Sequence, residues 1–219
     1  MRPKLIFLCL LAASAACKKN ADYPPELRPR DFFVRFTLLD ENGAGRLYEY
    51  RGETDTTIGQ PPGLTFTLSY FSNSAIRDSI RQITAGIAAP LLPAPFALRL
   101  NHPDKISDPF AVPEWTPSEL DFLLVPGKVF SFGDGPGEAK LVINDYPDGN
   151  WSCSSNSQSN TDGFLRIVEV EDYGAPEIGV PYFGKKVRIA FNARVYDALG
   201  EPRALHGGEA VLFFRYYIY

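Results

Sequence analysis

This sequence has few histidines and fewer basic than acidic residues, and each of these features excludes a class of function. The 219 residues include two histidines, His102 and His206, so a histidine-rich metal site is excluded. The 22 basic residues are outnumbered by 26 acidic ones, which gives a formal charge of −4. A protein that grips nucleic acid by its phosphates needs a basic face. We therefore expect no nucleic-acid partner.

A long apolar run is also missing, although a short one begins the chain. Arg2 and Lys4 precede the apolar stretch Leu5–Leu11, and small residues continue to Ala16. This run falls short of the roughly 20 residues that a membrane-spanning helix needs. A charged start, a short apolar run and small residues are typical of a secretory signal peptide. We predict a cleaved signal peptide over residues 1–16, which leaves a mature chain with 20 basic and 26 acidic residues.

The residue after this leader is Cys17, within Ser14-Ala-Ala-Cys17. These four residues resemble a bacterial lipobox, where signal peptidase II cuts before a cysteine that carries lipid. Ser14 departs from the leucine usual at that position. The resemblance implies that Cys17 is the lipid-attachment residue and that the membrane is a partner through this anchor. The alternative is an ordinary signal peptide cut after Ala16, which would leave a free thiol.

The chain after Cys17 is predicted to be a tether. Residues 17–30 are polar and rich in proline, which favours an extended chain. Lys18 and Lys19 would lie among lipid headgroups, where an anionic surface attracts basic residues. We expect a cell-envelope, outer-membrane lipoprotein, and its sequence leaves open whether it faces the periplasm or the cell surface.

Cysteine is too scarce for a disulfide framework in the mature chain. Cys9 leaves with the leader and Cys17 carries lipid, so Cys153 has no partner within the chain. Cys153 could be a nucleophile, but Trp151, Cys153 and Ser155 alternate along one strand face. We interpret Cys153 as a small apolar filler beside a tryptophan.

Residues 31–219 are predicted to form a single all-β domain. The segments Phe32–Leu39 and Arg46–Tyr50 flank an Asn-Gly pair, which is a strong hairpin signal. Val187–Val195 alternates apolar and polar residues, as a half-buried antiparallel strand does. Ala210–Tyr219 is apolar on both faces and is expected to be a central strand. We predict an antiparallel β-sandwich, or a barrel-like sandwich, with one or two short helices.

Two segments carry helix signals. The isoleucines from Ile76 to Ile87 recur at spacings of four, three and four, which indicates a helix between a cap at Ser74 and Pro90. Thr116-Pro-Ser-Glu119 is a capping box with proline at the first helical position. Trp115 can pack onto Leu120 from before this cap, and Pro126-Gly127 ends the second helix.

Several runs in the second half of the chain resemble a family. They are Gly127–Gly133, Trp151–Gln158 leading to Phe164–Val170, Phe191–Gly200 and Gly207–Phe213. Together they resemble uncharacterised β-rich lipoproteins of the Bacteroidota over roughly residues 127–215. The resemblance implies a β-sandwich, and its motifs are structural, so it implies no activity.

Two motifs resemble catalytic loops without completing them. Gly179–Lys186 nearly spells a phosphate-binding loop, but Lys186 stands where serine or threonine should hold Mg²⁺. We interpret this segment as an ordinary loop. His206-Gly-Gly208 is similar to the oxyanion glycines of lipases, but the chain has no G-x-S-x-G elbow. His206 is expected in the turn before the last strand, and His102 in an Asn-His-Pro loop.

Acidic residues offer two further candidates, each with a simpler alternative. Asp145, Asp148 and Asn150 could converge on Ca²⁺, but Pro-Asp-Gly is ordinary turn chemistry. Glu169 and Glu171 share a strand face, as a carboxylate pair could, although such pairs are more often solvated. We predict no metal or other cofactor.

The sequence therefore predicts a membrane-anchored lipoprotein of the cell envelope that is a non-catalytic binding module. Its ligand is a glycan, a peptide or a partner protein, presented to loops at the sandwich ends. The alternatives are a cell-envelope hydrolase with an unrecognised active site and a purely structural envelope component. Fold alone cannot separate these functions.

Overall fold

Antiparallel strands make up most of the described chain. The computed structural model describes residues 32–39, 42–51, 69–88, 95–108, 110–111, 113–144, 152–155, 160, 163–177, 180–196 and 200–216. In chain order the elements are β1 (Phe33–Leu39), β2 (Gly45–Arg51), β3 (Ser69–Arg77), β4 (Ile80–Ala88), β5 (Phe96–Lys105), α2 (Pro117–Leu123), β6 (Val129–Phe130), β7 (Ala139–Asn144), β8 (Ser152–Ser155), β9 (Phe164–Glu177), β10 (Val180–Tyr196) and β11 (Pro202–Tyr216).

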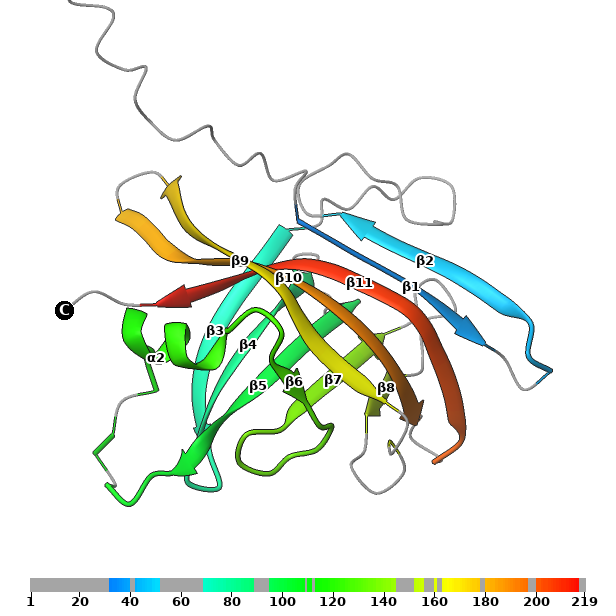
Figure 1. The fold of residues 1–219 in the computed structure, drawn as a ribbon, viewed down its shortest axis with the longest axis horizontal. Helices are drawn as coiled ribbons and strands as arrows, with labels where there is room; N and C mark the ends of the chain where they lie inside the picture. The colour runs from blue at the N-terminus through cyan, green and yellow to red at the C-terminus, as the bar shows by residue number, and fades with distance from the viewer. Residues whose placement is uncertain are drawn as a thin grey trace, which may run out of the picture.

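The strands follow one open path that is folded into two antiparallel sheets (Figure 1). One sheet runs β2-β1-β11-β10, and β9 pairs with β10 and with the short β6. The other runs β8-β7-β5-β4-β3. Two residue pairs between β10 and β8 join the sheets. The predicted all-β sandwich is confirmed, and β11 is the expected central strand, between β1 and β10.

The core lies between the two sheets. The ring of Phe96 on β5 lies 6.3 Å from that of Phe36 on β1 and 5.6 Å from that of Phe191 on β10. All three side chains are fully or almost fully buried. Burial of a phenylalanine contributes about 1.5–3 kcal/mol, so these aromatic contacts hold one sheet against the other.

Helix α2 connects the two sheets at one end of the sandwich. Its capping box is present as predicted, since the Thr116 side chain accepts from the Glu119 amide and Glu119 accepts from the Thr116 amide. Glu119 also forms an ion pair with Arg81 on β4. On the other side, Asp121 lies 2.5 Å from the Lys185 ammonium on β10. The helix is therefore tied to both sheets by charge as well as by its buried leucines.

The predicted helix from Ser74 to Pro90 is wrong, because these residues form the β3–β4 hairpin. Asp78 and Ser79 have φ angles of 51° and 62°, the left-handed pair that a tight hairpin turn requires. The pairing of β4 with β5 shifts register between Ile80 and Gln82. Such a bulge changes which face a side chain occupies, and so allows buried isoleucines three residues apart.

Three other expectations about loops are also wrong. His102 lies within β5, at a shift of register, rather than in a loop. His206 lies within β11, and the described part of the phosphate-loop-like segment, residues 180–186, belongs to β10. The strand β5 itself was not predicted.

Within the part of the chain that the structure describes, no helix has the length and apolar character to cross a membrane.

Candidate functional site

Strand β10 exchanges one neighbour for another near its end. Asn192 pairs with Phe164 of β9, whereas Val195 pairs with Ser155 of β8. Between these positions, the backbone of Arg194 bonds to a side chain. The Arg194 amide donates to Asn160 Oδ1 at 2.5 Å, and Asn160 Nδ2 donates to the Arg194 carbonyl at 2.8 Å. At this one residue, the Asn160 side chain thus makes the backbone hydrogen bonds that a neighbouring strand would make.

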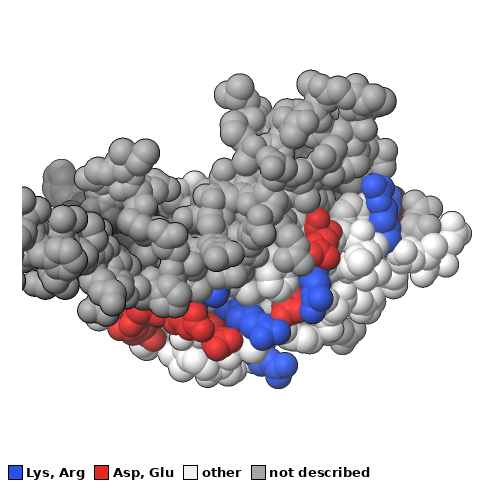
Figure 2. All heavy atoms as spheres, turned by 90° about the horizontal axis from the view of Figure 1, so that it is seen from above, with Lys and Arg blue, Asp and Glu red and all other residues white. Residues whose placement is uncertain are grey.

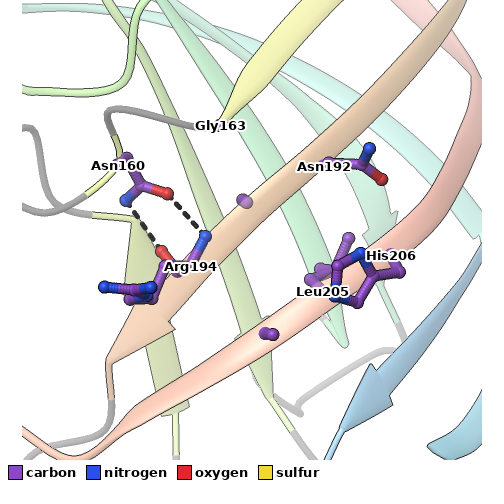
Figure 3. Close-up of a pocket in the computed structure, with 8 residues that line it drawn as sticks. Asn160, Gly163, Asn192, Arg194, Leu205 and His206 are labelled. Carbon is purple, nitrogen blue, oxygen red and sulfur yellow. Dashed lines mark hydrogen bonds between the residues drawn. The ribbon is translucent and has the colours of Figure 1, made fainter.

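A hollow of about 210 Å³ lies beside this change of partner (Figure 3). Its lining comes from the end of β10, the start of β11 and the segment that precedes β9. The lining residues are Asn160, Gly163, Asn192, Ala193, Arg194, Ala204, Leu205 and His206. Figure 3 shows Asn160 and Arg194 at one side of the hollow, and Asn192 and His206 at the other.

An irregularity between β10 and β11 shapes the side that carries His206. The register shifts between Phe191 and Ala193, and the Gly207 amide donates to Asn192 Oδ1 at 2.8 Å. Gly207 has a φ of 59°, which favours glycine. A Cβ on Gly208 would collide with the Phe191 ring. The two glycines therefore have backbone and packing roles, which account for the lipase-like His-Gly-Gly run.

Two arginines on the same sheet have an acidic partner, whereas Arg194 at the hollow has none among the described residues. Arg35 and Arg188 both bind Glu209, with Nε-to-oxygen distances of 3.0 and 2.7 Å. Burial raises the pKa of Glu209, but the hydrogen bonds from these two arginines outweigh it and lower that pKa. Among the described residues, the exposed side chains of Arg194 and His206 make no such pair. Arg194 therefore leaves one unpaired positive charge at the rim of the hollow.

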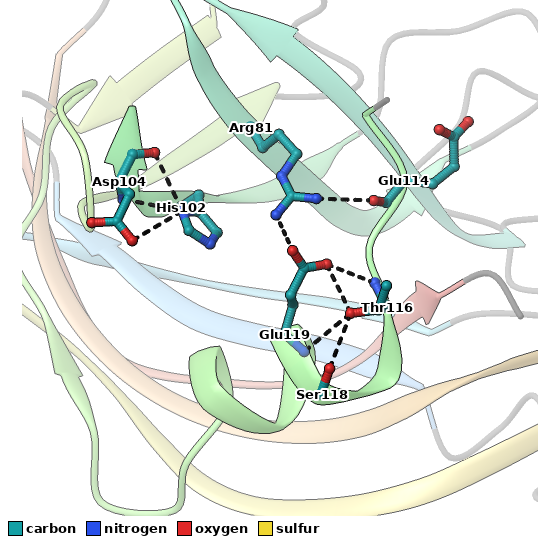
Figure 4. Close-up of polar contacts among 7 residues, drawn as sticks. All are labelled: Arg81, His102, Asp104, Glu114, Thr116, Ser118 and Glu119. Carbon is teal, nitrogen blue, oxygen red and sulfur yellow. Dashed lines mark hydrogen bonds and ion pairs between the residues drawn. The ribbon is translucent and has the colours of Figure 1, made fainter. Parts of the chain in front are cut away.

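A second polar cluster, around α2, is occupied by its own contacts (Figure 4). The Arg81 guanidinium pairs with Glu119, donates to the Glu114 carbonyl at 3.3 Å and lies 5.2 Å from the Trp115 ring centre. Burial raises the pKa of Glu119, yet bonds from Arg81 and Thr116 produce a net lowering. The cluster holds the helix in place, and its arginine is occupied by contacts within the protein.

His102 joins that cluster as a packing residue. Its Nδ1 accepts from the Asp104 amide at 3.0 Å, and its ring lies 5.4 Å from the Trp115 ring. In the described ranges, no group of three or more histidine, cysteine, aspartate or glutamate side chains could hold a metal ion. His102 lies on β5 beside Trp115, whereas His206 lies on β11 at the hollow.

The remaining candidates are surface residues or fall outside the description. Glu169 and Glu171 are exposed on β9, as expected of a solvated pair, and Lys186 lies 3.8 Å from Glu171. The calcium candidates at 145, 148 and 150 and the lipid-attachment residue Cys17 lie outside the described residues. Residue 153 lies on β8, but its side chain is outside the described set.

The charged side chains on one face of the molecule are of both signs. Seen from above, acidic and basic side chains follow one another across the visible face (Figure 2). The cross-strand set of Arg35, Glu209 and Arg188 has the same alternation. The described part of this face therefore carries charges of both signs.

The reasoning from sequence missed Asn160, Asn192 and Arg194. None of these three residues was given a role from the sequence. Arg194 does occupy a polar position of the alternating strand, a signal for exposure but not for a site.

Comparison with protein-family models, curated proteins and solved structures finds no match to this chain. The hollow therefore has to be interpreted from its own geometry.

Proposed function

We propose that the protein is a lipid-anchored component of the cell envelope whose β-sandwich is a non-catalytic binding module. The hollow between β10 and β11 is its ligand site. The supporting observation is that the side chains of Arg194 and His206, at this hollow, have no ion-pair partner among the described residues. Groups that serve the fold are paired, as Arg81 and Lys185 are, whereas these two remain available to a ligand.

The size of the hollow limits what it can hold. Drug-sized ligands occupy pockets of roughly 300–1,000 Å³, and this hollow has about 210 Å³. It suits a single sugar or amino-acid residue at the end or in the middle of a longer chain. The rest of a polymeric ligand would lie on the surface around it.

The anchor supports the same function. Each buried methylene of an acyl chain contributes about 0.8 kcal/mol, and a single chain binds a membrane only marginally. The two or three chains that a lipobox cysteine carries would hold Cys17 firmly. Residues 17–30 would then place the domain within roughly 45 Å of the bilayer, at about 3.3 Å per residue.

A screen against immobilised glycans and peptides tests the binding function. The full-length protein in detergent micelles is compared with Ala204→Phe, which fills the hollow from the partly exposed Ala204 side chain. We expect a ligand that the original protein retains and the filled variant loses. Binding that is equal in both proteins would move the site elsewhere, and turnover of a substrate would favour the hydrolase alternative.

The anchor has its own test. Mass spectrometry of the mature amino terminus should find diacylglycerol on Cys17, and Cys17→Ala should prevent this processing. An unlipidated terminus would refute the anchor while leaving the binding site intact. Protease treatment of whole cells would decide between the periplasmic face and the cell surface.

A further inference from the structure

We propose that the hollow between β10 and β11 binds a sugar residue that carries a carboxylate, as uronic acids do. The inference rests on the proposed binding function and names its ligand class. The Arg194 guanidinium is the group that would bind the carboxylate. Its planar fork presents parallel N–H donors that match the two oxygens of a carboxylate.

The charges at the hollow favour an acidic ligand. Among the described lining residues, Arg194 carries a positive charge and none is an aspartate or glutamate. In the described chain, Arg35, Arg81 and Arg188 each have a carboxylate partner, and Arg194 has none. A ligand carboxylate would complete at Arg194 the pairing that those arginines have within the protein.

The backbone beside the hollow argues against an extended peptide as the ligand. A peptide that adds to a sheet edge bonds to the free amide and carbonyl groups of that edge. At Arg194 both groups are taken by Asn160, at 2.5 and 2.8 Å. Recognition at this point therefore depends on side chains, which suits a sugar ring with one charged and several hydroxyl groups.

Two further side chains provide groups for the hydroxyls. Asn192 uses its Oδ1 to accept from Gly207, and its amide nitrogen has no partner among the described residues. His206 lines the same side of the hollow and can donate or accept. On the opposite side Gly163 packs closely, since a Cβ there would lie 2.9 Å from Asn160 Oδ1 and 3.1 Å from the Phe132 ring. The hollow thus offers one cation and two neutral polar side chains to a ligand.

Calorimetric titration tests this with probes that differ in a single charge. The full-length protein in micelles is titrated with oligogalacturonate, with the fully methyl-esterified form of the same oligosaccharide, and with neutral oligogalactose. A parallel titration uses oligosaccharides that contain glucuronate. We expect binding of at least one acidic probe and at least about tenfold weaker binding of its esterified form, because a hydrogen bond between charged groups is lost.

Two substitutions locate the binding. Arg194→Gln keeps the backbone bonds to Asn160 and removes the charge, so it should weaken binding of the acidic probe at least about tenfold. Arg166→Gln is the matched control, because Arg166 is an exposed cation on β9 that lies over the Phe164 ring and is not among the described lining residues of the hollow. It should leave affinity unchanged. Ala204→Phe should abolish binding of every probe, and thermal unfolding shows whether each variant is folded.

The outcomes separate this inference from the function on which it rests. Equal binding of the acidic and esterified probes, or equal loss in Arg194→Gln and Arg166→Gln, refutes the acidic-sugar ligand. A neutral glycan or a peptide whose binding is lost in Ala204→Phe refutes it too, but leaves the hollow as the binding site. Absence of binding by any acidic sugar, neutral sugar or peptide contradicts both proposals.

Discussion

Replacing Asn160 by alanine tests how the end of β10 is held. The change removes two hydrogen bonds to the Arg194 backbone, at 2.5 and 2.8 Å, in a partly buried setting. A backbone group left without a partner costs about 1–3 kcal/mol when fully buried. Because water can reach part of this site, we take the lower figure for each group, which gives about 2 kcal/mol in total.

For a chain of this size, 2 kcal/mol lowers the melting temperature by about 4–8 °C. Circular dichroism on heating measures the change, and hydrogen exchange at the Arg194 amide should become faster. Asn192→Ala is the control, since it removes one bond, from the Gly207 amide, in an exposed setting. That loss should cost about 0.5 kcal/mol. If Asn160→Ala melted no lower than Asn192→Ala, the bridging role of Asn160 would be refuted.

Three further predictions concern the fold around the site. Ser79→Gly should stabilise the protein by about 1 kcal/mol in urea unfolding, since Ser79 has a φ of 62°, and Ser79→Val should destabilise it; the reverse order would contradict the turn assignment. Gly208→Ala should lower stability by about 1–3 kcal/mol, because its methyl group meets the Phe191 ring, and an unchanged urea midpoint would refute that contact. Glu119 and Glu209 have pKa values lowered from 4.5 in the folded chain, so the unfolded chain binds protons first and stability should fall as the pH drops from about 5 to 3. The fall should be shallower in Glu119→Gln, and an identical pH dependence would contradict the role of that ion pair.

Local signals in the sequence predicted the first hairpin, α2, β10 and β11. The Asn-Gly pair fixed the β1–β2 hairpin, and the capping box at Thr116 and Glu119 located α2 to the residue. Alternation predicted β10, and an apolar run predicted that β11 is central. These signals depend on residues that are close together in the sequence, so they can be interpreted without knowledge of the tertiary structure.

The failures come from features that depend on distant partners. The isoleucine spacing looked helical because a turn at Asp78 and Ser79 and a bulge at Ile80 interrupted the alternation of two strands. The hollow was not predicted because Asn160 and Arg194 are 34 residues apart and meet only after β10 exchanges β9 for β8. Period-two patterns report which side chains are exposed, not which exposed side chains lie together.

The most direct test of the binding site is an NMR titration of the isotopically labelled protein with the best ligand from the glycan and peptide screen. The account predicts that the largest amide shifts cluster at Gly163, Ala204 and His206, around the hollow. The same titration of Ala204→Phe should leave these amides unshifted. Shifts that cluster on β3, β5 or α2 instead, and that persist in the filled variant, would contradict the central claim that the β10–β11 hollow is where this protein meets its ligand.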